Sequence, residues 1–419
     1  MNLSEKGWFK QLISSQASKR EQEIADKNKY IYKTTHSSGL IYGHPVLPKE
    51  FKTPEFLELP QSEKLKLVLL DGFIKTAVFP ADDLIPQDPD AFVHYLAESI
   101  IEYYSHVIPH KKIKERNFWG KKLSNEEIVE SLLNDRLNLD TAEAGNFWLN
   151  FFSNSLLFLD VFFFGEWLGS RHEEATVAKI RQHRDRLHLL LLQVMACAAY
   201  ADNTLQEEEK ILFDQFLASA NLPEDMAETA ANYIKTGVQI TELDLSAANN
   251  WLLKKYILEL AILTIWADQI VTEEERGFIG KFAGKLGFNE DELEQSMVAI
   301  ESFVISNWGN IPFLQAKNSF TDIRDQFVSR ISKVMHKNES RIGNEIKQSQ
   351  ELSELLVKHA QTDLSEEEQI KVRTQLINIL KSLPTFVIIA LPGSFLTLPL
   401  LLKILPESTL PPALQEDEL

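Results

Sequence analysis

The sequence predicts an all-α protein built of helical bundles. Alternating β-branched runs bounded by turns, which mark strands, hardly occur along the 419 residues. Helical spacing with capping residues recurs from about Ser62 onward: Asp88-Pro89 places an N-cap before a proline at the first helical position, and residues 124–127 form a capping box. The 44% hydrophobic content is sufficient for sizeable packed cores.

Five segments follow from this pattern. Ser38-Gly39, Gly43-His44-Pro45 and Pro48 interrupt any helical period, so the start of the chain is expected to be an irregular arm. The expected segments are the arm at 1–60, a helical domain at 61–188, a duplicated helical domain at 189–305, connecting helices at 306–358, and a C-terminal membrane segment with an acidic tail at 359–419.

Charge and cysteine content indicate which partners are excluded and in which cellular compartment the chain resides. The 61 acidic and 43 basic residues give a net charge of -18, which repels phosphate backbones, so no direct nucleic-acid partner is expected. Cys197 is the only cysteine, so an intrachain disulfide is excluded, and this low cysteine content is typical of a reducing compartment. Cys197 lies in an apolar run, where a thiol usually packs as a small hydrophobic group. Residues 1–20 lack the apolar core of a secretory signal, so this end is expected to stay in the cytoplasm.

Residues 147–167 are rich in Phe and Leu and precede a basic stretch, a pattern that also occurs at membrane spans. Asp160 and Glu166 interrupt the run, and a central Asp costs about 2.5–3.5 kcal/mol in a bilayer. We therefore expect a buried or interface helix here. The alternative is a membrane span or an in-plane membrane helix.

An internal repeat occupies the centre of the chain. Residues 201–210 (Ala-Asp-Asn-Thr-Leu-Gln-Glu-Glu-Glu-Lys) recur as residues 267–276 (Ala-Asp-Gln-Ile-Val-Thr-Glu-Glu-Glu-Arg), an offset of 66. The same offset pairs Phe216 with Phe282. One helix–loop–helix–loop segment is thus used twice, and in each copy an apolar helix ends at the Asp and the next helix begins at the Glu triplet.

The two copies, over residues 189–304, resemble the tellurite-resistance B family of small helical-bundle domains. In that family an apolar helix runs into Ala-Asp-Gly before a Glu-rich helix start, whereas Asn203 and Gln269 replace the Gly here. The resemblance implies a divalent-cation site at the acidic cluster. Its ligands would be Asp202, Glu208, Asp268 and Glu274.

Helix capping is the alternative role for these acidic residues. The macrodipole favours carboxylates in the first turn of a helix, and Thr272 with Glu275 forms a capping box without any metal. An EF-hand is excluded, because Phe213 stands where that loop needs a bidentate Glu.

The C-terminal part contains an uncharged stretch of 21 residues, from Ser382 to Leu402. A helix of this length, at about 1.5 Å per residue, matches a hydrocarbon core of roughly 30 Å. Its prolines would break a helix in a soluble core, but a membrane helix tolerates them. A re-entrant or in-plane hairpin, and burial in the protein's own core, are the alternatives.

Pro384, Pro392, Pro399, Lys403 and Pro406 follow one another in a distinctive register. In this register residues 366–414 resemble the transmembrane stretch of the leucine-zipper, EF-hand-containing transmembrane proteins of the mitochondrial inner membrane and their bacterial relatives. Phe395 stands where that family has an intramembrane acidic residue, which argues against cation/proton exchange by this chain alone. The positions of the membrane segment are Pro384, Phe386, Pro392, Gly393, Pro399, Lys403 and Pro406.

The sequence contains no Walker loop, dinucleotide fingerprint, zinc-protease motif or nucleophile elbow, so neither an enzyme nor a cofactor is expected. Lys371, Arg373 and Lys381 precede the uncharged stretch and acidic residues end the chain, which favours a cytoplasmic body at a bacterial inner membrane. The predicted function is a membrane-associated helical scaffold or sensor, whose partners are the lipid bilayer and a protein of unknown identity.

Family resemblance links this function to biofilm or envelope-stress traits. The alternatives are a subunit of a homo-oligomeric cation transporter, a ribosome-binding protein by family label, and a soluble metal-binding stress protein.

Overall fold

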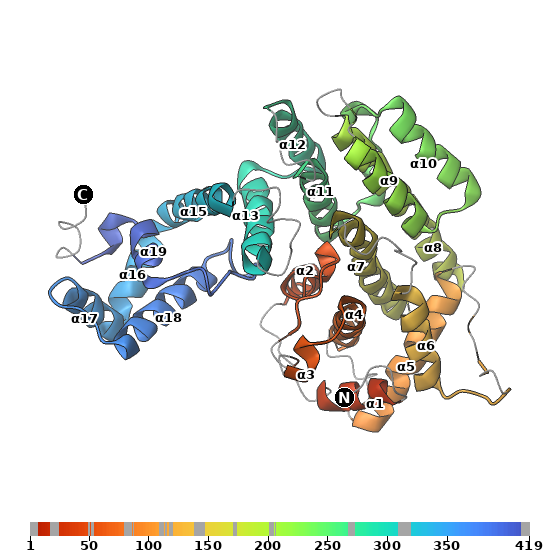
Figure 1. Ribbon diagram of the computed structural model, residues 1–419, viewed down its shortest axis with the longest axis horizontal. Coiled ribbons are helices and arrows are strands. Elements are labelled where there is room, and N and C mark those ends of the chain that lie inside the picture. Colours follow the sequence, from red (N-terminus) through yellow and green to blue (C-terminus); the bar gives the residue numbers. More distant parts are fainter. Residues whose placement is uncertain are drawn as a thin grey trace. The chain divides into compact units, whose positions relative to one another are not determined.

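The computed structural model describes residues 7–16, 25–48, 51, 54–78, 86, 88–108, 113, 115–116, 120–137, 147–170, 174–200, 205, 207–266, 273–308 and 320–411. Within these ranges the regular elements are helices and no strand is present, which confirms the all-α class. The chain divides into two compact units, Met1–Leu286 (unit 1) and Gly287–Leu419 (unit 2) (Figure 1).

The N-terminal part of unit 1 is more regular than the sequence indicates. The irregular arm expected at 1–60 instead contains buried helices. Asp26 begins one of them, because its carboxylate accepts hydrogen bonds from the backbone N–H groups of Asn28 and Lys29. Gly39 and Gly43, with φ of 67° and 65°, bound a short turn of 3-10 helix rather than an extended arm. The elements are α1 (Trp8–Gln16), α2 (Lys27–Ser37), η1 (Leu40–Tyr42) and α3 (Pro54–Leu57).

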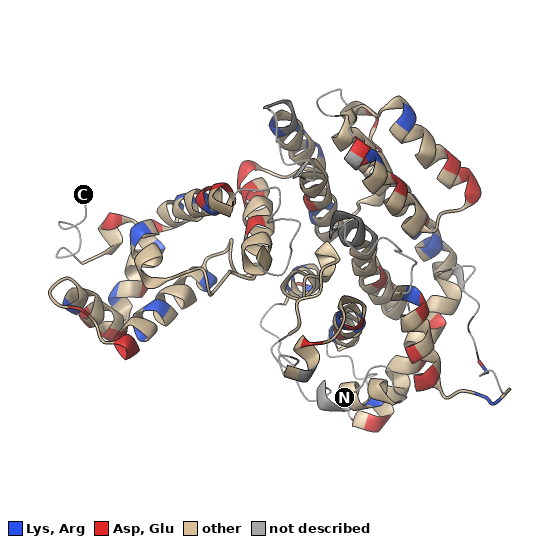
Figure 2. Ribbon diagram, in the orientation of Figure 1, with Lys and Arg blue, Asp and Glu red and all other residues tan. Residues whose placement is uncertain are grey.

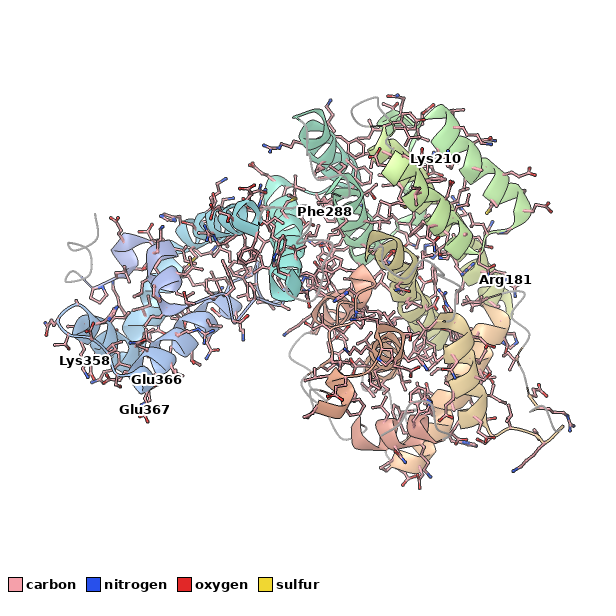
Figure 3. All side chains as sticks on the ribbon, in the orientation of Figure 1. Arg181, Lys210, Phe288, Lys358, Glu366 and Glu367 are labelled. Carbon is pink, nitrogen blue, oxygen red and sulfur yellow. The ribbon has the colours of Figure 1, made fainter. Side chains whose placement is uncertain are left out.

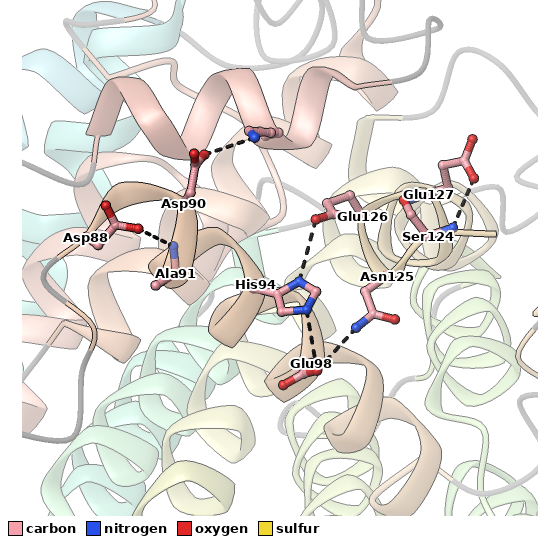
Figure 4. Close-up of polar contacts among 10 residues, drawn as sticks. Asp88, Asp90, Ala91, His94, Glu98, Ser124, Asn125, Glu126 and Glu127 are labelled. Carbon is pink, nitrogen blue, oxygen red and sulfur yellow. Dashed lines mark hydrogen bonds and ion pairs between the residues drawn. The ribbon is translucent and has the colours of Figure 1, made fainter.

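The predicted helix starts at Asp88 and Ser124 are confirmed. Asp88 accepts a hydrogen bond from the backbone N–H of Ala91 at 2.9 Å, and Ser124 exchanges hydrogen bonds with Glu127 (Figure 4). Between the two helices His94 lies 3.9 Å from Glu98 and 3.8 Å from Glu126, a set of solvent-exposed contacts of small energy. The two helices are α5 (Pro89–His106) and α6 (Asn125–Leu137), and α4 (Gln61–Ala77) precedes them in the chain.

Helix α7 (Phe147–Gly169) lies in the core of unit 1 and packs against α4, η1 and α9 (Glu207–Ala220). Asp160 is buried there, where Arg136 Nε donates to it at 2.7 Å and Tyr104 donates at 3.0 Å. The expectation of a buried or interface helix is therefore confirmed over residues 154–167, the part of this helix whose side chains the structure describes. Of the residues that the structure describes, none form a helix both long and apolar enough to cross a bilayer.

The order of the central helices repeats with the offset of 66 residues that the sequence repeat has. The second helix of each copy begins and ends at positions 66 residues apart, and so does the start of the third. The turn between them is left-handed in both copies, with φ of 52° at Asn221 and 85° at Gly287. The first copy is α8 (Glu174–Ala199), α9 (Glu207–Ala220) and α10 (Glu224–Thr236), and the second is α11 (Trp251–Trp266), α12 (Glu273–Leu286) and α13 (Glu290–Asn307). Short 3-10 turns η3 (Ile240–Glu242) and η4 (Leu245–Ala247) join the copies.

Unit 2 contains α13 and the helices that follow it. Helix α13 packs against α15 (Phe320–Lys337), which also contacts α19 (Leu398–Ile404). Helix α17 (Gln350–His359) packs against α18 (Glu366–Ser382). Ser365 and Glu368 form a capping box at the start of α18, and Lys358 of α17 pairs with Glu368 at 2.7 Å, close to Glu366 and Glu367 (Figure 3). The elements are α15 (Phe320–Lys337), α16 (Glu339–Gln348), α17 (Gln350–His359), α18 (Glu366–Ser382), α19 (Leu398–Ile404) and η6 (Glu407–Thr409).

Candidate functional site

The uncharged C-terminal stretch is not a continuous helix. Helix α18 ends at Ser382, residues 383–397 form turns and irregular backbone, and α19 begins only at Leu398. The expected helix from Ser382 to Leu402 is therefore wrong. Pro384 and Pro392 supply no backbone N–H and exclude the helical conformation from the residue before them, whereas Pro399 lies in the first turn of α19, where proline is tolerated.

Helix α13 binds the backbone of this segment through two side chains. Gln295 Nε2 donates to the carbonyl oxygen of Thr385 at 3.1 Å, and Ser302 Oγ donates to the carbonyl oxygen of Ala390. Because turns leave carbonyl groups without the partners that a helix provides, such side-chain donors replace the missing helical hydrogen bonds.

Two arginines of other helices bind further carbonyl groups. Arg373 of α18 donates from Nε to Leu396 at 2.8 Å, and its terminal nitrogen donates to Gly393. Arg341 of α16 donates to the carbonyl of Ser382 at 2.9 Å. Donors from three helices thus fix the irregular segment within unit 2.

Apolar side chains of the segment complete its attachment. Leu383, Phe386 and Leu396 are buried. Phe395, which stands where the resembled family has an acidic residue, packs in edge contacts against two phenylalanines of α15, with ring centroids 6.4 Å from Phe320 and 5.8 Å from Phe327. An aromatic cluster of Phe320, Phe327 and Phe395 therefore attaches the segment to α15.

The predicted membrane-segment residues divide between the core and the surface of unit 2. Phe386, Pro392 and Pro406 are buried, whereas Pro384, Gly393, Pro399 and Lys403 are exposed. We use the name C-terminal surface for the exposed uncharged positions of this segment, namely Pro384, Val387, Gly393, Ser394, Thr397 and Pro399.

The C-terminal surface carries an exposed apolar side chain and is flanked by cations. Val387 is 39% exposed, and Ile370 of α18, one turn before Arg373, is 55% exposed. Lys381 and Lys403 border the uncharged stretch, are exposed, and form no ion pair with any described residue. This combination suits an apolar or anionic partner.

A buried carboxylate lies beside this attachment, between α13 and α15. Glu301 is 0% exposed, and Arg330 Nε of α15 donates to its Oε1 at 2.9 Å, while Oε2 has no hydrogen-bond partner among the residues that the structure describes. Burial raises the pKa of Glu301 to about 7, against the opposing attraction of Arg330. Arg330 also lies 3.7 Å from Glu294, which stands seven residues before Glu301 on α13.

Ion pairs between acidic α13 and basic α15 continue beyond this carboxylate. Lys337 of α15 contacts Asp291 and lies 3.9 Å from Glu294. Figure 2 shows the acidic and basic positions along the ribbons of α13 and α15. Sequence analysis did not identify Glu301. The signal available was one charge within the apolar run from Met297 to Ile305, a position at which a carboxylate is rarely solvated.

The predicted metal ligands are not brought together in the part of the chain that the structure describes. Asp202 and Asp268 lie outside the described residues, and Glu208 and Glu274 belong to the first turns of α9 and α12, where their side chains are not described. Within the described ranges, no three His, Cys, Asp or Glu side chains are arranged to hold a metal ion.

Comparison of the chain with known proteins finds no matching family model and no significant match to a curated protein or to a solved structure.

Proposed function

We propose that this protein is a non-enzymatic helical scaffold that attaches to the surface of a lipid bilayer through the C-terminal surface of unit 2. The bilayer in this proposal is a bacterial inner membrane, with the body of the chain on its cytoplasmic side. The resemblance of residues 366–414 to a membrane-protein family supports that location. Unit 1, which contains all the duplicated helices except α13, would bind a protein partner.

The observation that carries the proposal is an uncharged stretch in which side-chain donors of the same unit bind five of the carbonyl groups. A backbone group without a partner costs several kcal/mol at an apolar interface, so irregular backbone is tolerated there only when protein groups satisfy it. Gln295, Ser302 and Arg373 supply such donors. The segment can therefore present Val387 to lipid while protein donors bind the carbonyl groups of Thr385, Ala390 and Leu396.

Lys381 and Lys403 add an electrostatic contribution. A lysine near an anionic leaflet contributes about 1 kcal/mol to binding, and salt weakens this attraction. The pair flanks an apolar stretch, the combination that holds peripheral segments at the boundary between headgroups and acyl chains. We therefore expect attachment that is reversible and depends on anionic lipid.

Co-sedimentation of the full chain with lipid vesicles tests the proposal. We expect binding to vesicles that contain anionic lipid and weaker binding to zwitterionic vesicles. Val387→Asp should weaken binding by about tenfold or more, since it loses the burial of a valine and adds a negative charge. Ile211→Asp on α9 of unit 1 is the matched control, because Ile211 is similarly exposed, at 43%.

Two outcomes contradict the proposal. One is that the full chain remains in the supernatant with both kinds of vesicle. The other is that the two aspartate variants bind equally well, which would place the lipid contact elsewhere on the chain.

A further inference from the structure

Two helices of unit 2, α13 and α15, attach the C-terminal segment to the unit. Helix α13 binds its backbone through Gln295 and Ser302, and α15 packs Phe327 against Phe395 and also contacts α19. Both sets of contacts form at once only while α13 and α15 keep their present spacing. A group that changes the packing of these two helices would therefore change how firmly the segment is held.

Glu301 lies at the contact between these two helices and directly precedes Ser302. Its carboxyl group is fully buried and receives one hydrogen bond, from Arg330, while the second oxygen has no partner within the described part of the chain. A buried ionised carboxylate is expensive unless its oxygens are well paired. The ionised form is therefore incompletely stabilised in this position, whereas the protonated form avoids most of the desolvation cost.

The charged surroundings of Glu301 come from two elements. Arg330 of α15 attracts the ionised form, and Glu294 of its own helix opposes it. Lys337 of α15 interacts with Asp291 and Glu294, farther along the helix pair. The C-terminal segment contributes no titratable group between Ser382 and Leu402.

We propose that Glu301 is a proton-binding site, and that loss of its proton loosens the attachment of the C-terminal segment to α13 and α15. In the protonated state the neutral carboxyl group remains buried and the helices stay packed. After deprotonation the carboxylate gains hydration when α13 and α15 separate, and separation breaks the bond from Ser302 to Ala390. The proton equilibrium itself is independent of any membrane, whereas its effect on the C-terminal surface rests on the proposed function.

The pKa of Glu301 gives this response its pH range. Burial raises it from 4.5 to about 7 in the packed state, and exposure on opening returns it toward 4.5. The packed state thus binds the proton more tightly, so opening becomes more favourable as the pH rises from about 4.5 to 7 and then levels off. Between pH 5.5 and 7.5 the opening constant should increase by about tenfold or more.

Hydrogen exchange of the full-length protein tests the proposal without lipid. Amide exchange would be measured by mass spectrometry for peptides within 383–397 at pH 5.5 and 7.5, after correction for intrinsic exchange rates. We expect about tenfold lower protection at pH 7.5 in the wild-type protein. Glu301→Gln, which cannot ionise, should keep the high protection of pH 5.5 at both values.

Asp291→Asn is the matched control, because it removes a carboxylate of α13 from an exposed ion pair and should retain the wild-type pH response. Protection of α16 and α17 peptides shows whether unit 2 of each variant is folded, and unit 1 peptides serve as an internal reference. Equal wild-type protection at the two pH values overturns the proposal without recourse to any variant, and so does a Glu301→Gln protein that keeps the pH response. Failure of vesicle binding would leave these results unaffected.

Discussion

Buried charges in this protein differ in how completely they are paired. Asp160 in unit 1 receives hydrogen bonds from Arg136 and from a tyrosine, and Glu259 receives hydrogen bonds from two tyrosine hydroxyl groups. Glu301 in unit 2 receives its one observed hydrogen bond from Arg330, counted over the residues that the structure describes. The first two positions are those of well-satisfied structural carboxylates, whereas Glu301 has the incomplete pairing of a group that changes its protonation state.

The raised pKa of Glu301 has a consequence for stability. The folded state binds a proton more tightly than the unfolded state between pH 4.5 and 7, so this residue makes unit 2 less stable as the pH rises through that range. The effect is on the order of 3 kcal/mol. Denaturant titrations of wild type and Glu301→Gln should show that the variant's advantage grows between pH 5 and 8.

The difference between the two proteins is the relevant quantity, because other groups titrate as well. Burial, with a smaller contribution from nearby Arg184, lowers the pKa of His188 in unit 1, which gives the opposite trend. That trend is shared by wild type and variant and cancels in the comparison. An advantage of Glu301→Gln that is constant with pH would show that Glu301 titrates normally.

At the scale of elements, helix starts were predictable and the C-terminal break was not. The caps at Asp88 and Ser124 and the repeat at 66 residues follow from local chemistry, which short sequence patterns record. For residues 382–402, the apolar length favoured a membrane helix, whereas the prolines would break a helix in a soluble core. The break prevailed, because side chains such as Gln295, 90 positions away from Thr385, satisfy the freed carbonyl groups.

Two glycines in helices should respond to alanine in opposite directions. A Cβ on Gly72 of α4 would lie 2.8 Å from Val161 Cγ2 of α7, so Gly72→Ala should lower the free energy of unfolding by about 1–3 kcal/mol. A Cβ on Gly280 of α12 would meet nothing within 4 Å, so Gly280→Ala should raise it by about 0.5–1 kcal/mol. Denaturant unfolding at one pH measures both, and effects of the same sign would contradict the packing described for these helices.

At the scale of the molecule, unit 2 includes the C-terminal segment in its own core. Sequence analysis placed residues 359–419 in a segment of their own, because their composition differs from that of the preceding helices. Their partners are distant in sequence: Ser302 bonds to Ala390, and Phe327 packs on Phe395. Such contacts depend on the tertiary arrangement, and no local pattern records them.

A truncation after Lys381 should therefore unfold unit 2 and spare unit 1. It removes Leu383, Phe386, Leu396 and Leu401, which are all almost completely buried. At about 1.5–3 kcal/mol for each buried side chain, this loss is comparable with the 5–15 kcal/mol that stabilises a typical domain. Hydrogen exchange should show loss of protection in α13 and α15, with protection of α7 and α11 retained.

Retained protection in α13 and α15 after truncation would mean that the segment adds little to the core. The expected outcome also decides how lipid binding has to be tested. If removal of the segment unfolds unit 2, loss of vesicle binding by the truncated chain reports unfolding rather than loss of a lipid contact. Val387→Asp avoids this ambiguity, because Val387 is partly exposed and its replacement leaves the buried residues of the segment in place.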